Sequence, residues 1–172
     1  MYIFAFDVTL AMLGVLIGLA CESVGLTAVA VLSMADMLSL SRPRKEGLGD
    51  DYASLAVAVF VAWAGVSLVL GGVREAAVQA AVHPIALITA VTIIVIKLVL
   101  MRQGWLRQPW LQEHYVTDAV VLGLLVVSYF VTLLSKVYLE PGLVVIIGVL
   151  VLYEAIELMA EAIQEIRSAF KR

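Results

Sequence analysis

The residues best suited to chemistry are a histidine and an aspartate four positions apart, His114 and Asp118. In a helix this spacing places both side chains on one face, one turn apart. An imidazole nitrogen and a carboxylate oxygen on adjacent turns can hold one divalent cation. These donors suit zinc, iron or manganese better than calcium. The alternative is that both residues lie near the lipid headgroups at the start of a helix and bind nothing.

A further carboxylate, Asp36, lies in the apolar segment AVLSMADMLSL. If its helix packs beside the helix of His114 and Asp118, the three residues form a site of one histidine and two carboxylates. The alternative is a carboxylate at the cytoplasmic mouth of its helix, either solvated or paired with Arg42. The residues alone leave both interpretations open.

An acidic stripe lies near the end of the chain, where four glutamates recur at helical spacing: Glu154, Glu157, Glu161 and Glu165. One interpretation is a solvated face where the last helix leaves a membrane. The other is a funnel that gathers cations at the cytoplasmic mouth, formed by Glu154 and Glu157. The spacing is compatible with both.

The composition places these residues in a membrane protein. The chain has 172 residues, of which 63% are hydrophobic, and a mean hydropathy of +1.07. A soluble domain is nearer half apolar, and a small domain cannot bury such an excess in one core. The net charge of -3 and the lack of a long basic run argue against nucleic acid as a partner. Lipid is the expected solvent, and the single Cys21 excludes an intrachain disulfide.

Six apolar segments are long enough, or nearly so, to cross a bilayer, which takes about 20 residues in a helix. They are residues 3–20, 24–40, 52–73, 84–101, 110–134 and 142–163. Pro84, Pro109 and Pro141 stand where helices are expected to begin, a position that tolerates a missing N–H. We therefore predict an all-α fold, a polytopic bundle of about six transmembrane helices forming one domain over residues 1–172, without a soluble C-terminal domain.

The basic residues predict the orientation, because cytoplasmic loops carry the excess of Lys and Arg. Eight of them follow the second, fourth and sixth spans: Arg42, Arg44, Lys45, Arg102, Arg107, Arg167, Lys171 and Arg172. The opposite side has Arg74 and Lys136. Six spans with both termini cytoplasmic satisfy this bias. We expect Lys97 to reach toward the same basic side by snorkelling, and Asp7 to be interfacial.

The last third of the chain resembles the cation diffusion facilitator family of divalent-metal/proton antiporters. HYVTD (114–118) is similar to the HxxxD motif of the family's fifth span. Glu140–Pro141 is similar to the acidic residue and proline that open its sixth span, and Leu152–Tyr153 and 161–163 are similar to its end. The resemblance is clear over residues 108–168 and fair over 46–75.

The second span departs from the family pattern. In SVGLTAVAVLSMAD (23–36), Asp36 matches the later ligand of the family's second HxxxD or DxxxD, whereas Leu32 stands where the first ligand belongs. The span is also shorter than is usual in the family, whose members typically carry a soluble domain after the sixth span. These departures place a standard four-ligand site in doubt.

The resemblance implies a transporter, not an enzyme, that moves Zn²⁺ out of the cytoplasm in exchange for protons, with iron or manganese as other candidate cargoes. It implies Asp36, His114 and Asp118 as the metal ligands. It also implies a prokaryotic-type inner or plasma membrane and a homodimer formed through the membrane helices. Histidine titrates near neutrality and binds metal only when neutral, which suits exchange of metal for protons.

A different class of function is a non-transporting accessory subunit of a larger membrane complex that keeps the fold and has lost a complete metal site. Leu32 and the short second span favour this alternative, because zinc sites use three or four donors. The register of His114 with Asp118 favours transport.

Overall fold

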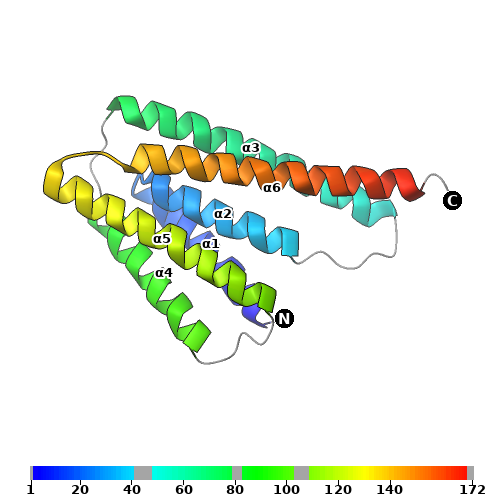
Figure 1. Cartoon of the computed structure of the whole chain (residues 1–172), viewed down its shortest axis with the longest axis horizontal. Helices are drawn as coiled ribbons and strands as arrows, with labels where there is room; N and C mark the ends of the chain where they lie inside the picture. The colour runs from blue at the N-terminus through cyan, green and yellow to red at the C-terminus, as the bar shows by residue number, and fades with distance from the viewer. Residues whose placement is uncertain (1, 41–47, 79–82, 103–108, 170–172) are drawn as a thin grey trace.

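A computed structural model of the chain describes residues 2–40, 48–78, 83–102 and 109–169, which are helical apart from short turns (Figure 1). These residues form six α-helices: α1 (Tyr2–Ala20), α2 (Val24–Leu40), α3 (Leu48–Val78), α4 (Pro84–Arg102), α5 (Pro109–Ser135) and α6 (Glu140–Ala169). The prediction of an all-α fold is confirmed, and each predicted span coincides with one helix. Pro84 and Pro109 are the first residues of their helices, and Pro141 is the second residue of its helix.

Two helices are longer than their apolar segments. α3 begins four residues before the predicted span 52–73 and ends five residues after it, and α6 likewise outruns 142–163 at both ends. Hydropathy detects the apolar part of a helix, whereas the helix itself continues through good helix formers such as Glu75 and Arg167. The N-terminal end of α3 and the C-terminal end of α6 extend past the other four helices on one side of the molecule in Figure 1.

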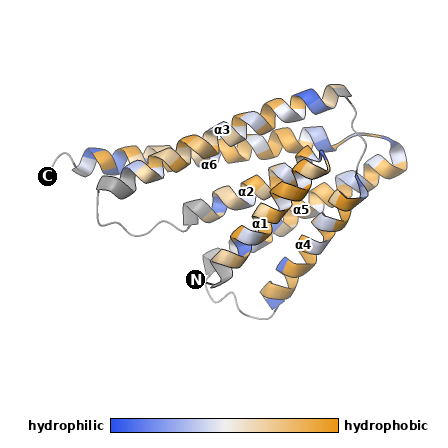
Figure 2. Cartoon of the chain, turned by 180° about the vertical axis from the view of Figure 1, so that it is seen from behind, coloured by the Kyte–Doolittle hydropathy of each residue, from blue (hydrophilic) through white to orange (hydrophobic). Residues whose placement is uncertain are grey.

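Four helices are long and apolar enough to cross a membrane, within Tyr52–Ala77, Pro84–Arg102, His114–Ser135 and Glu140–Ser168. Apolar residues dominate the helices in Figure 2, and many apolar side chains face outward, among them Phe60, which is 70% exposed. These helices indicate an integral membrane protein. The apolar segments of α1 and α2 are shorter, Ala5–Ala20 and Val24–Met37, so six crossings with both termini on one side stay a prediction.

α3 and α6 lie side by side along most of their length, because glycines let their backbones approach closely (Figure 1). A Cβ atom at Gly65 would lie 3.1 Å from the carbonyl oxygen of Gly148, and one at Gly148 would lie 2.9 Å from the backbone nitrogen of Val69. Any larger residue would push the two helices apart.

α2 lies at the centre of the bundle, in contact with α1, α3, α5 and α6, while α4 packs against α5 and α1. Its residues Leu26, Val29 and Leu32 are almost fully buried and join the main apolar core. Leu32, which stands where the family has a ligand, is therefore a core residue. The short α2 is enclosed mainly by protein.

Glu140 fixes one end of α2. Its Oε1 accepts hydrogen bonds from the backbone N–H of Gly25 at 2.9 Å, from Ser23 Oγ at 3.0 Å and from the hydroxyl of Tyr129 at 3.3 Å. Ser23 also caps α2, because its Oγ accepts from the backbone N–H of Leu26 at 3.2 Å. The first N–H groups of a helix have no partner within it. Glu140 thus ties the start of α2 to α5 and α6.

Candidate metal centre

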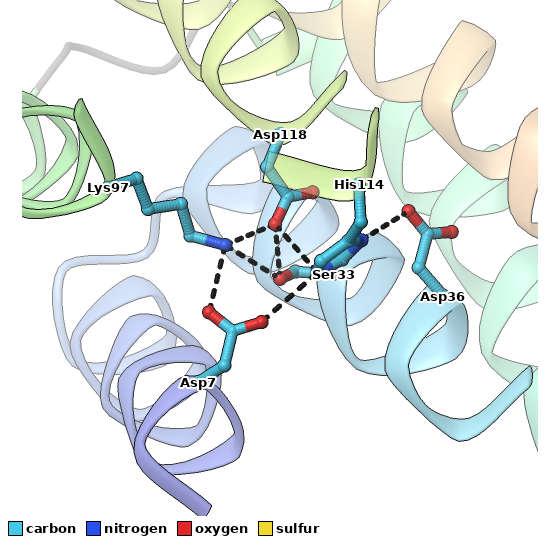
Figure 3. Close-up of polar contacts among 6 residues, drawn as sticks. All are labelled: Asp7, Ser33, Asp36, Lys97, His114 and Asp118. Carbon is cyan, nitrogen blue, oxygen red and sulfur yellow. Dashed lines mark hydrogen bonds and ion pairs between the residues drawn. The ribbon is translucent and has the colours of Figure 1, made fainter. Parts of the chain in front are cut away.

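Five ionisable side chains from four helices converge inside the bundle (Figure 3). They are Asp7 on α1, Asp36 on α2, Lys97 on α4, and His114 and Asp118 on α5. Their exposed fractions range from 0% for Asp118 to 8% for Asp36. Buried charges are costly unless they are paired, so the contacts among these five groups determine what the site can bind.

The imidazole of His114 lies among three carboxylates. Its Nε2 is 3.0 Å from Asp7 Oδ2 and 3.5 Å from Asp118 Oδ2, and its Nδ1 is 3.2 Å from Asp36 Oδ2. The four-residue spacing on α5 turns His114 and Asp118 inward together, as the sequence predicts. Both nitrogens of the ring therefore face an acidic oxygen.

Asp7, His114 and Asp118 form a group that could hold a metal ion, because one donor atom from each lies within 4.8 Å of the others. One imidazole nitrogen with two carboxylate oxygens is a donor set that suits zinc, iron or manganese. Three protein ligands leave a coordination position open for water. The second oxygen of Asp118, Oδ1, is buried and has no hydrogen-bond partner among the described residues. It is therefore available as a further metal ligand.

Asp36 meets His114 from the other side of the ring. It contacts Nδ1, whereas Asp7 and Asp118 face Nε2. The sequence predicts Asp36 as the second carboxylate ligand beside Asp118, and the structure places it where it orients the imidazole. Carboxylates in this position fix the tautomer and the direction of a metal-binding histidine.

Asp7 is the carboxylate that the sequence interpretation missed. The expectation of an interfacial residue is wrong, because Asp7 is 1% exposed and contacts both His114 and Lys97. A single aspartate in the apolar segment 3–20 indicates that a charge lies within the membrane. It carried no information about which helix α1 would face.

Lys97 also lies inside the bundle. Its Nζ is 3.1 Å from Asp7 Oδ1, pairs with Asp118 Oδ2, and donates to Ser33 Oγ at 3.3 Å. The expectation that it snorkels is wrong, because Lys97 is 2% exposed. Lys97 is buried because it lies on the face of α4 that packs on α1 and α5.

That face of α4 has a recognisable pattern. Ala86, Ala90, Ile93 and Lys97 are its buried residues, and their spacings of four, three and four define one helix stripe. Small residues on this stripe let α4 approach closely and carry Lys97 to the carboxylates. Ser33 on α2 completes the contact, since its Oγ donates to Asp118 Oδ2 at 2.6 Å.

The acidic stripe of α6 leads toward this centre. Glu154, Glu157, Leu158 and Glu161 line a hollow of about 210 Å³. Glu157 accepts a hydrogen bond from the hydroxyl of Tyr153 at 2.8 Å, and Glu154 interacts with Asp36. The stripe is therefore continuous with the His114 network through Asp36. Whether it gathers cations stays a prediction.

No protein-family model matches the chain, and no curated protein matches it. The resemblance of residues 108–168 to the cation diffusion facilitators rests on the motifs alone.

Proposed function

We propose that the protein transports a divalent cation such as Zn²⁺ in exchange for protons, as a minimal or divergent relative of the cation diffusion facilitators. The observation that carries the proposal is the buried group of Asp7, His114 and Asp118 inside a bundle with four membrane-length helices. Efflux from the cytoplasm and assembly as a homodimer through the helices are part of the proposal. They rest on the motifs of α5 and α6.

Exchange follows from the chemistry of the group. Metal binding at His114 Nε2 requires a neutral imidazole, and carboxylate ligands must be ionised, so an arriving ion displaces protons. Uncompensated charge inside a membrane is expensive. When the metal leaves, a proton returns to His114 and replaces part of the metal's charge. The Asp36 carboxylate keeps the ring of His114 in position in both states.

The acidic hollow on α6 offers a route of entry. Carboxylates that line a hollow raise the local concentration of cations. Glu154 links this hollow to Asp36, which contacts His114. A cation gathered beside Glu157 would therefore approach His114 from its Nδ1 side, opposite the metal group.

The test is zinc flux into liposomes that contain the purified protein, driven by an imposed pH gradient. We expect flux in the native protein and its loss in Asp118→Asn. The matched control is Glu22→Gln, which removes an exposed carboxyl group in the turn between α1 and α2. Absence of flux in the native protein, or equal flux in Asp118→Asn, would overturn the proposal.

One observation favours the accessory-subunit alternative. Lys97 already neutralises part of the negative charge on Asp7 and Asp118. Under this alternative, the ion network holds α1, α4 and α5 together and has no other role. In that case neither zinc nor protons cross the bilayer, and Asp118→Asn alters stability alone.

A further inference from the structure

Lys97 places a positive charge on the two carboxylates that a metal ion would use. Its ammonium contacts both Asp7 and Asp118, and the Asp118 oxygen that it holds is the one 3.5 Å from His114 Nε2. In Figure 3 the two carboxylates lie between the ammonium on one side and the imidazole on the other. Two of the three candidate ligands are thus already paired with a cation that belongs to the chain.

The cavity beside Lys97 and Asp118 is small. A cavity lined by Ser33, Lys97 and Asp118, with apolar residues around them, has a volume of about 20 Å³. This is room for about one water molecule. A divalent ion with three protein ligands brings at least one further ligand, such as water. The cavity could take this water, whereas the ion itself would compete with the ammonium for Asp7 and Asp118.

We propose that Lys97 is a tethered competitor of the transported ion, whose ammonium holds Asp7 and Asp118 while the ion is absent and withdraws when the ion binds. This inference rests on the proposed function, since it takes the ion to bind at Asp7, His114 and Asp118. The ring of Tyr115 lies 4.9 Å from the Nζ atom of Lys97. The ammonium already lies over this aromatic face, which can continue to stabilise it when the carboxylates bind the ion.

The competition has a use in transport. A divalent ion interacts more strongly with each carboxylate than a singly charged ammonium does, so it can displace Lys97 on entry. When the ion is ready to leave, the returning ammonium neutralises the same two oxygens. Lys97 thereby lowers the affinity for the ion and favours its release.

Removal of Lys97 changes the zinc affinity in opposite directions for a competitor and for a purely structural residue. If Lys97 only holds the helices in place, its removal loosens the site and weakens zinc binding. If Lys97 competes with zinc, its removal strengthens zinc binding.

The experiment is calorimetric titration of the full-length purified protein in detergent with ZnCl₂ alone as the probe. We expect Lys97→Gln to bind zinc at least about tenfold more tightly than the native protein, because a like charge in contact with the site is gone. Lys97→Arg keeps the charge, and its planar fork holds two carboxylates more firmly than an ammonium does. We expect it to bind zinc at least about tenfold more weakly. Lys136→Gln, on the exposed turn before α6, should bind as the native protein does.

The outcomes separate this inference from the function on which it rests. Native zinc binding with equal or weaker binding by Lys97→Gln overturns the competition and leaves the transport proposal standing. Zinc binding by Lys97→Gln alone supports the competition and overturns transport by the native protein. Binding by neither overturns both. If Lys97→Gln does not fold, Lys97→Arg decides, and native or tighter binding by that variant overturns the competition.

Discussion

The ammonium of Lys97 on α4 pairs with the carboxylate of Asp118 on α5, and both side chains are almost completely buried. Both charges lie away from bulk water, so each depends on the other and on Asp7 and Ser33. In this arrangement the stability of the bundle and the chemistry of the site share the same atoms.

Replacing Lys97 by methionine should destabilise the bundle. Removing one partner of a buried ion pair leaves the other uncompensated, which costs about 3–5 kcal/mol. Adding Asp118→Asn to Lys97→Met should recover part of that loss, because the two sites are directly coupled. Unfolding of the purified protein by denaturant measures both effects, with Lys136→Met as the control. Native stability in Lys97→Met would show that the pair is not formed.

Asp7 and Asp36 should differ in their effect on metal affinity. Asp36 reaches the metal group through the far nitrogen of His114, and loss of such an orienting carboxylate typically lowers affinity about 10–100-fold. Asp7 supplies an oxygen on the Nε2 side, so Asp7→Asn should lower zinc affinity by more than Asp36→Asn does. Titration of both variants with zinc gives the ranking. The reverse ranking would make Asp36 the ligand and Asp7 the orienting residue.

The positions of the helices could be predicted because each is one uninterrupted apolar segment bounded by prolines or polar loops. The segment 84–101, for example, became α4 with a shift of one residue at its end. The lengths of α3 and α6 could not be predicted, because their polar ends lie outside the apolar segments that hydropathy detects. The pairing of α3 with α6 depends on Gly65 and Gly148, which the sequence does not assign to one another.

The site could be predicted only where its residues share a helix. His114 and Asp118 lie one turn apart on α5, so their spacing alone brings them together. Asp7 and Lys97 come from α1 and α4. A single charge in an apolar segment indicates that the residue lies within the membrane, but it does not identify the residue's partner. The buried stripe of α4 that ends in Lys97 was the one available signal.

Glu140→Ala should destabilise the protein through the start of α2. The substitution leaves the N–H of Gly25 without its acceptor, and the hydroxyls of Ser23 and Tyr129 with only each other as partners. Buried donors that lose their acceptor cost about 1–3 kcal/mol. Glu140→Gln keeps an acceptor oxygen and should lose less. Thermal unfolding in detergent compares the two, and equal melting temperatures for both variants would contradict the role of Oε1.

Gly148→Ala should separate α3 from α6. The added Cβ would lie 2.8 Å from a side-chain carbon of Val69 and 2.9 Å from its backbone nitrogen, so a helix has to move. Overpacking of this kind costs about 1–3 kcal/mol. The matched control is Gly123→Ala on α5, where an added Cβ meets nothing within 4 Å and the helix gains up to about 1 kcal/mol from the better helix former. Thermal unfolding of both variants should therefore shift in opposite directions. A native melting temperature for Gly148→Ala would mean that α3 and α6 are not in backbone contact at this position.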